Sequence, residues 1–333
     1  MSEDQPALSV IVAASDSLQA VAQTIRSLRA QNGIDRAELI VAADRARITP
    51  TANDPMAGVH WVAAEPGSGV PRLRRLGLDQ ARGSVVVFTE DSCLFDPDWI
   101  SRWIQAFDDP TVAAATGPVE PAMGDAAVDW AVFFCEYASF LPARTRQAGP
   151  PSRLAGNNFA VRVTGTKTGL AALARAEIQE NDVHRELRQR GAAIVEATTA
   201  LARHVRRYTW REAVGDRFRF GLEFGRLRAQ WHAKPLNAVA FLAAPAIFTA
   251  QFGRLTATII AQRRYRRRFL TSLPMILGLL MAWSIGEALG WTWGPAPPRH
   301  SAGNGCDRAD RTQAPATDRN RPPQGYTGER ESV

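Results

Sequence analysis

The sequence predicts an α/β fold in which a mostly parallel sheet is flanked by helices and followed by C-terminal membrane helices. Short apolar runs rich in β-branched residues alternate with segments of helical periodicity as far as residue 91. Acidic residues end two of these runs. After residue 235 the composition changes to long apolar stretches separated by a cluster of arginines.

The first apolar run, residues 8–14 (LSVIVAA), predicts a buried strand. Residues 16–31 carry apolar side chains at helical spacing, with Asp16 or Ser17 as the N-cap. Further strands are expected at residues 37–44 (AELIVAAD), 58–65 (GVHWVAAE) and 84–91 (SVVVFTED), with a helix at residues 69–83. Strands and helices that alternate at this rhythm are typical of βαβ units and a parallel sheet.

The pattern loosens after residue 114, and four further elements are expected. They are a loop entering a strand at residues 153–164, a charged helix at 176–191, a strand at 192–205 and a basic amphipathic helix at 207–230. Gly191 is a typical residue for the end of the charged helix.

We expect an α/β domain over residues 1–232, a membrane-associated region over 233–293 and a disordered tail over 294–333. Residues 236–260 are interfacial or spanning, and residues 269–293 are long and apolar enough to span. If both segments cross, the arginine cluster lies opposite the N-terminal domain, which the positive-inside rule opposes. We therefore favour a single span; a shallow hairpin, or two buried helices of a soluble domain, are the alternatives.

The composition favours some classes of partner and enzyme for this protein and disfavours others. The 333 residues carry a formal net charge of +7, which fits an anionic partner such as nucleic acid, a membrane surface or a phosphorylated substrate. Basic and aromatic residues do not interleave as in nucleic-acid-binding proteins, so we expect no nucleic acid. The three cysteines lie far apart and match neither a zinc spacing nor a disulfide framework. No G-x-G-x-x-G fingerprint is present, which disfavours a nicotinamide or flavin enzyme.

The end of the fourth predicted strand carries two adjacent acids, Glu90 and Asp91. In open α/β sheets, ligands bind at the carboxyl ends of the strands. Carboxylates there can hold Mg²⁺ or Mn²⁺ against phosphate groups. The pair is therefore either a metal and phosphate site or the polar end of a buried strand.

The order of these elements resembles the inverting family 2 glycosyltransferases, whose GT-A fold is Rossmann-like. The resemblance covers roughly residues 8–224 and rests on motifs that are weak singly and more specific in their order. These motifs are LSVIVAASDSLQAVAQTIRSL, ELIVAAD, GVPRLRRLGLDQARGSVVVFTEDS, LAGNNFAVR and ENDVHRELRQRG.

The resemblance implies a nucleotide-sugar donor site. The donor-binding positions that it implies are Ala13, Asp16, Asp44, Arg74, Glu90 and Asp91. For Asp44 the alternative is a strand-end residue that caps a turn, and for Arg74 it is a solvated arginine on a helix.

The resemblance also implies a divalent metal, Mg²⁺ or Mn²⁺, because Glu90, Asp91 and Ser92 fall where the family has Asp-x-Asp. Glu replaces the first Asp of that motif and Ser replaces the last, and Ser is a poor ligand for a divalent ion. His204 is a further metal candidate by the same resemblance, although a lone His is more often structural.

Glu180 and Asp182 fall where the family places its catalytic base, and Asp182 is the first choice. An inverting transfer needs one carboxylate to take the proton of the acceptor hydroxyl. The alternative is acidic charge at a helix N-terminus. Gly156, Asn157 and Asn158 match the acceptor side, although Gly-Asn-Asn is also common in turns.

The resemblance and the apolar segments together predict a glycosyltransferase that moves a sugar to an acceptor hydroxyl with inversion. The expected acceptor is lipid-linked or a polysaccharide, and the expected location is the inner (cytoplasmic) membrane with the catalytic domain on the cytoplasmic side. The departures from the metal motif support a different hypothesis, a catalytically silent GT-A-like module that acts as a scaffold in a membrane complex.

Overall fold

The computed structural model describes residues 5–46, 48, 58–142, 150–165, 167–231 and 237–294. They belong to one compact unit that ends at Pro295. The predicted tail lies outside the described residues, apart from Gly294.

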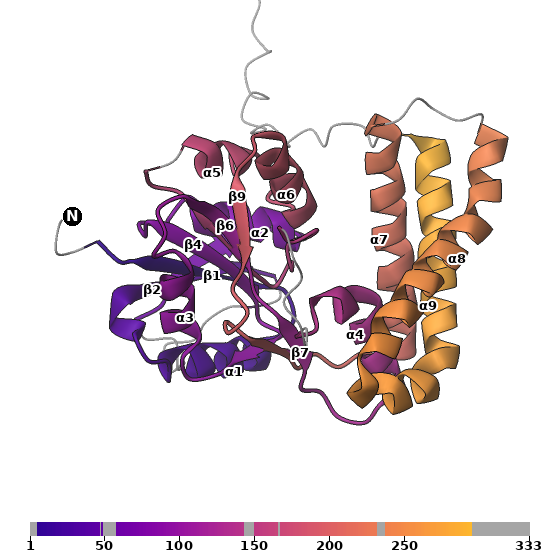
Figure 1. Ribbon diagram of the computed structural model, residues 1–333, viewed down its shortest axis with the longest axis horizontal. Coiled ribbons are helices and arrows are strands. Elements are labelled where there is room, and N and C mark those ends of the chain that lie inside the picture. Colours follow the sequence, from indigo (N-terminus) through magenta and orange to yellow (C-terminus); the bar gives the residue numbers. More distant parts are fainter. Residues whose placement is uncertain are drawn as a thin grey trace, which may run out of the picture. The chain divides into compact units, whose positions relative to one another are not determined.

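The main sheet has seven strands in the order β3-β2-β1-β4-β8-β6-β9 (Figure 1). These strands are β1 (Leu8–Ala14), β2 (Ala37–Asp44), β3 (His60–Ala64), β4 (Val85–Glu90), β6 (Val112–Thr116), β8 (Asn158–Arg162) and β9 (Ala193–Glu196). Only β8 is antiparallel to its neighbours β4 and β6, and the other pairs are parallel. The predicted mostly parallel sheet is confirmed.

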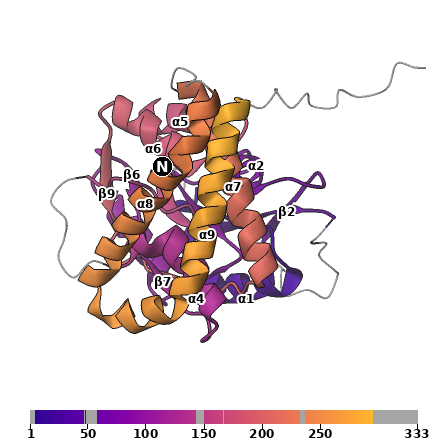
Figure 2. The same cartoon turned by 90° about the vertical axis from the view of Figure 1, so that its right-hand side faces the viewer.

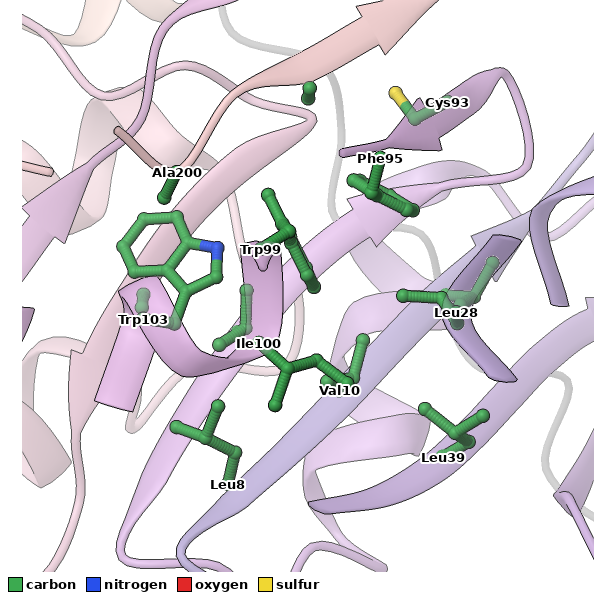
Figure 3. Close-up of a cluster of buried hydrophobic side chains, with 14 of the residues drawn as sticks. Leu8, Val10, Leu28, Leu39, Cys93, Phe95, Trp99, Ile100, Trp103 and Ala200 are labelled. Atoms are coloured by element: carbon green, nitrogen blue, oxygen red, sulfur yellow. The ribbon is translucent and has the colours of Figure 1, made fainter. Parts of the chain in front are cut away.

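Helices cover both faces of this sheet. They are α1 (Leu18–Arg29), α2 (Val70–Leu78), α3 (Trp99–Ala106), α5 (Lys167–Ala172) and α6 (Glu180–Gln189). Alternate residues of a strand face opposite sides. Val10 of β1 accordingly packs in one core cluster with Leu28 of α1 and Trp103 of α3 (Figure 3). Its neighbour Ile11 packs in another cluster with Leu187 of α6.

The prediction of one continuous strand at residues 192–205 is wrong. The segment is divided into β9 and β10 (Ala202–His204), which belong to different sheets. A turn in which Ala200 N donates to Ala197 O at 2.9 Å separates them. β10 pairs with β5 (Cys93–Phe95) and β7 (Val119–Pro121) in a second, three-stranded sheet.

Helix α4 (Ala127–Tyr137), together with the short strands β6 and β7, is absent from the sequence-based expectation. Its sequence, AVDWAVFFCEY, is apolar around most of its circumference, so it shows no amphipathic period. Phe134 of α4 packs against Phe269, with ring centroids 5.8 Å apart. Helix α4 therefore connects the sheet to the C-terminal helices.

The C-terminal helices are α7 (Trp210–Trp231), α8 (Asn237–Ala261) and α9 (Arg266–Trp293). The basic helix expected at 207–230 and the two apolar segments are thus helical. Among the described residues, the segment Arg263–Trp293 is the one helix long and apolar enough to cross a membrane. Helix α9 packs against α4, α7 and α8 (Figures 1 and 2).

Candidate functional site

The carboxyl ends of three parallel strands bring the predicted donor-side residues to one edge of the sheet. β1 lies between β2 and β4, and Ala13 is paired in register with Glu90. Asp44 ends β2, and Asp91 follows β4 directly. Ligands of open α/β sheets bind outside this edge. The sheet order therefore gathers residues that lie up to 78 positions apart in the sequence.

Asp91 closes the turn that follows β1. Its Oδ2 atom accepts hydrogen bonds from the backbone N–H groups of Ser15 at 2.9 Å and Asp16 at 2.7 Å. Burial raises the pKa of Asp91 to about 7, although the bond from Asp16 N opposes this shift. Asp16 itself is exposed.

Arg74 of α2 is buried and holds two carboxylates from distant parts of the chain. Its Nη2 donates to Glu90 Oε1 at 3.1 Å, and its Nη1 donates to Glu180 Oε2 at 2.9 Å. The same nitrogens bind the carbonyl oxygens of Gly156 at 2.8 Å and Ile178 at 3.2 Å. Arg74 thus ties the end of β4 to the first turn of α6.

Burial raises the pKa of Glu90, and the charge of Arg74 only partly offsets that effect. A second carboxylate, Glu180, adds to the rise because like charges disfavour ionisation. The Arg74 guanidinium therefore stabilises two acids that would otherwise repel each other.

Gly156 lies directly against this cluster. A Cβ atom at Gly156 would stand 3.2 Å from Arg74 Nη2 and 3.3 Å from Glu180 Cδ, so a side chain here would press on the pair. Asn157 follows; it is fully buried, and neither atom of its side-chain amide has a hydrogen-bond partner among the described residues. Such an unpaired buried amide is rare in folded proteins and calls for an explanation.

Asn158, in contrast, is fully engaged in the fold. Its Oδ1 accepts from Trp99 Nε1 at 3.1 Å, and its Nδ2 donates to the carbonyls of Pro118 and Ala200 at 2.8 Å each. The two neighbouring asparagines therefore differ in their hydrogen bonding, although the sequence gives no reason to distinguish them.

Asp182 lies in the first turn of α6, as Glu180 does. Its Oδ1 accepts a hydrogen bond from Arg185 at 2.6 Å. Both acidic side chains retain some exposure, 14% for Asp182 and 24% for Glu180. The first turn of α6 therefore presents two carboxylates, each paired with one arginine.

Asp44 caps the turn at the end of β2, as the alternative interpretation of this residue predicted. Its Oδ1 accepts from Ala46 N at 2.8 Å and its Oδ2 accepts from Gly67 N at 2.7 Å. The side chain is buried. The Asp44 carboxylate thereby holds the loop after β2 against the loop after β3, at the carboxyl edge of the sheet.

His204 is buried in an aromatic environment. Its ring centroid lies 5.0 Å from that of Tyr137 and 6.5 Å from that of Tyr208. Burial lowers the pKa of His204 to about 3, with a smaller contribution from Arg206, so the imidazole is neutral. Its Nδ1 has no partner among the described residues. No cluster of three or more His, Cys, Asp or Glu side chains suited to a metal occurs in the described part of the chain.

The residues present still offer hard oxygen donors for a cation that also binds a diphosphate. Within the described residues, Glu90 Oε2 and Asp91 Oδ1 make no hydrogen bond, and these two carboxylates are adjacent in the chain. Oxygen atoms of this kind are the ligands that Mg²⁺ and Mn²⁺ prefer, with substrate phosphates completing the shell. The pair fits a metal shared with a ligand rather than a metal held by protein alone.

Two charged residues near Glu90 were not anticipated from the sequence. Burial raises the pKa of Glu136 in α4 to about 7; Arg217, 3.7 Å away, lowers it and Glu90 raises it further. Burial lowers the pKa of Arg206, but Tyr208 and the acidic charges of Asp16 and Glu90 outweigh that and raise it overall.

Arg206 makes no hydrogen bond or ion pair within the described residues, and its guanidinium lies 4.9 Å from the Tyr208 ring centroid. Arg206 is thus a cation that is influenced by the charges of Asp16 and Glu90 without a direct ion pair to either within the described residues. The lone acid in the apolar run FFCEY was the available sequence signal for Glu136. Arg206 had no such signal, because it is one of many arginines in that region.

Comparisons with known proteins agree with this geometry. Residues 9–160 match the family model described as Glycosyl transferase family 2. The solved structure of the mannosyltransferase PcManGT from Pyrobaculum calidifontis, in complex with GDP-Man and Mn²⁺, is similar with a TM-score of 0.50. It shares 16% identity over 86% of this chain and 88% of that chain. This likeness establishes the fold, which is GT-A-like.

A structure of GalNAc-T7 with UDP, GalNAc and Mn²⁺ is also similar, with a TM-score of 0.44 and 16% identity, over 62% of this chain and 45% of that chain. No curated protein matches the chain.

Proposed function

We propose that this protein is an inverting glycosyltransferase that moves a sugar from a nucleotide-sugar donor to an acceptor hydroxyl. One observation carries the proposal. Arg74 binds Glu90 on the metal side and Glu180 on the base side, so both groups of acids meet at one sheet edge. The family match over residues 9–160 supports this assignment.

The donor would lie across the carboxyl ends of β1, β2 and β4. Glu90 and Asp91 would hold a divalent ion, which neutralises the diphosphate leaving group when bound. Asp16 N and Ser15 N, already fixed by Asp91, would shape the loop around the phosphates. Arg206 would supply positive charge to the diphosphate, because Arg74 is occupied by carboxylates. PcManGT, solved with GDP-Man and Mn²⁺, supports a nucleotide donor and a metal.

The base would be Asp182, with Glu180 as a positioning residue held by Arg74. A carboxylate within hydrogen-bond reach of the acceptor hydroxyl takes its proton as the oxygen attacks the anomeric carbon. One displacement without a covalent intermediate inverts the configuration. Gly156, which lies against Glu180, and Asn157, whose side-chain amide has no partner within the described residues, would contact sugar hydroxyls.

The acceptor would be a lipid-linked sugar or a growing polysaccharide at the inner (cytoplasmic) membrane, reached from the cytoplasmic side. The apolar helix at Arg263–Trp293 supports a membrane location. It packs on α4, which carries Glu136 near the acid cluster. A membrane-bound acceptor would thus approach from the side of α4 and α9.

One observation favours a catalytically silent scaffold as the second candidate. Ser92 stands where the family motif has its last Asp, and Ser is a poor ligand for a divalent ion. In that case the site would bind a donor without turning it over.

The test is donor binding by the full chain. UDP-, GDP- and dTDP-sugars would be titrated by calorimetry, with and without Mn²⁺, on the wild type, Asp91→Asn and Arg206→Gln. We expect one nucleotide class to bind with Mn²⁺, and both variants to weaken that binding. Ser101→Ala, on α3, is the control variant. Binding of no donor by the folded protein would refute the enzyme, and binding without sugar transfer to membrane extracts would favour the scaffold.

The base is identified by a second comparison. Asp182→Asn and Glu180→Gln should both retain donor binding, and Asp182→Asn should abolish transfer. Complete loss with Glu180→Gln and full activity with Asp182→Asn would reverse the assignment.

A further inference from the structure

Helices α7 and α9 touch backbone to backbone through two pairs of glycines. Gly221 and Gly225 lie four residues apart on α7, and Gly286 and Gly290 lie four residues apart on α9. A Cβ atom at Gly225 would stand only 2.1 Å from the carbonyl oxygen of Glu287. Small residues at this spacing allow two helices to approach closely. Helix α9 is therefore bound tightly to α7.

This contact extends along much of both helices, which run side by side in the same direction (Figures 1 and 2). Near the start of α7, the ring of Trp210 would be 2.7 Å from a Cβ atom at Gly278 of α9. Near its end, the guanidinium of Arg226 lies 5.8 Å from the ring centroid of Trp293. Wherever the second half of α9 lies, α7 therefore lies beside it.

Helix α7 is too charged to enter a bilayer. The part that runs beside α9 contains the ionisable residues Arg211, Glu212, Asp216, Arg217, Arg219, Glu223, Arg226 and Arg228. Placing one Arg or Asp at the bilayer centre costs about 2.5–3.5 kcal/mol on insertion scales. A crossing by α9 would bring many of these groups into the hydrocarbon, because the glycine contacts leave no room for lipid between the helices.

The side of α9 that faces away from α7 is an apolar stripe. It is formed by Leu270, Pro274, Met281 and Ile285, all exposed and spaced to share one helical face. Leu270 is 65% exposed and Met281 is 56% exposed. Every large exposed hydrophobic side chain in the described part of the chain lies on α7, α8 or α9. A contiguous apolar surface of this kind marks an interaction site.

The stripe begins beside a cluster of exposed arginines at the junction of α8 and α9. Arg264 pairs with Glu120, and Arg266 donates to the carbonyl oxygen of Ile260. Arg263 and Arg267 have no acidic partner within the described residues. Each basic side chain near an anionic membrane surface contributes about 1 kcal/mol of attraction. The charge therefore complements anionic phospholipid headgroups.

We propose that α9 lies in the plane of an anionic phospholipid bilayer, with its apolar stripe in the boundary between headgroups and acyl chains, instead of crossing it. The arginines at the α8–α9 junction bind headgroups, and α7 stays on the water side. This replaces the single span predicted at residues 269–293. The inference refines the membrane location in the proposed function, and it holds whether or not the site transfers sugar.

The membrane topology of the chain distinguishes a helix α9 that lies in the membrane plane from one that spans the bilayer. Single cysteine probes are Arg26→Cys on α1, Arg267→Cys at the start of α9, and the native Cys306, each in a chain whose other reactive cysteines are replaced by alanine. A membrane-impermeant maleimide is added to sealed vesicles of both orientations. We expect all three positions to react from the same side. Cys306 reacting from the side opposite Arg26→Cys shows a span by α9, and Arg267→Cys reacting from the opposite side shows a spanning hairpin. Either result overturns the proposal.

Sedimentation of the full chain with lipid vesicles tests the surface itself. Arg263→Glu with Arg267→Glu should lower binding to phosphatidylglycerol-containing vesicles about tenfold or more, and leave binding to pure phosphatidylcholine vesicles unchanged. Leu270→Glu with Met281→Glu should lower binding to both. Arg26→Glu with Arg102→Glu, an equal charge change on α1 and α3, should have no effect.

Wild-type binding by both test variants would refute the membrane surface. Donor calorimetry on the same variants reports separately on the catalytic site. Failure of the membrane proposal is thus distinguishable from failure of the proposed function.

Discussion

The Nη1 atom of Arg74 lies 2.9 Å from Glu180 Oε2, so α2 is hydrogen-bonded to the first turn of a helix that begins 106 residues later. The same guanidinium binds Glu90 at the end of β4. A single buried cation therefore sets the distance between the acids assigned to the metal and those assigned to the base. Loss of the Arg74 guanidinium would therefore lower both the stability of the fold and the activity of the site.

Arg74→Met should strongly destabilise the fold. Removal of one partner from a buried ion pair leaves uncompensated charge, which costs about 3–5 kcal/mol. Urea unfolding of wild type and variant measures the change. Arg72→Met, an exposed arginine of the same helix, is the control and should change stability by less than about 1 kcal/mol. Equal effects of the two variants would contradict the role of Arg74.

Gly156→Ala should impair turnover more than donor binding. The new Cβ atom would stand 3.2 Å from Arg74 Nη2 and shift the Arg74–Glu180 pair. Small displacements of catalytic groups cost up to about 100-fold in rate. We expect a fall in kcat of about tenfold or more, with donor affinity within about twofold of wild type. Gly215→Ala, in α7 with open space around it, is the control. A wild-type kcat would show that the cluster tolerates this shift.

The stability of the protein should depend on pH through Glu136. Burial raises the pKa of Glu136 from 4.5 to about 7 in the folded state. The folded state then binds the proton more tightly than the unfolded state, so this contribution is present below pH 4.5 and is lost as the pH rises through about 7. Glu136→Gln should reduce the loss of stability between pH 4.5 and pH 7 by about 3 kcal/mol.

Thermal or urea unfolding across that range measures the Glu136 effect. Glu223→Gln, which removes an exposed charge from α7, is the matched control. An unchanged slope in Glu136→Gln would show that this carboxyl does not titrate as described.

Gly225→Ala should loosen the contact between α7 and α9. Its Cβ atom would meet the carbonyl oxygen of Glu287 at 2.1 Å, and overpacking of this kind costs about 1–3 kcal/mol. The free energy of unfolding reports the loss. Gly253→Ala in α8 meets no atom within 4 Å and should be neutral or stabilise the helix by up to about 1 kcal/mol. If both substitutions stabilise the protein, the close helix contact is absent in solution.

Local sequence patterns were enough to predict the strands of the sheet core and the acids at their ends. Residues 8–14 form β1 with the predicted bounds, because a short β-branched run between polar segments favours a buried strand whatever its partners are. Glu90 and Asp91 lie at the predicted edge for the same reason. The helical character of the two C-terminal apolar segments was equally local, since it follows from length and composition.

Tertiary structure alone decided what those residues contact. Nothing local in the sequence shows that β8 inserts antiparallel between β4 and β6, or that residues 192–205 divide between two sheets. Asn157 and Asn158 are neighbours in the chain, yet within the described residues only the side-chain amide of Asn158 has hydrogen-bond partners, which come from Trp99, Pro118 and Ala200. In the sequence, Arg74 is one of several arginines on a helix. In the fold, two glutamates from distant parts of the chain bind it. Such long-range pairings depend on how whole elements pack, and the sequence pattern of any single element does not contain them.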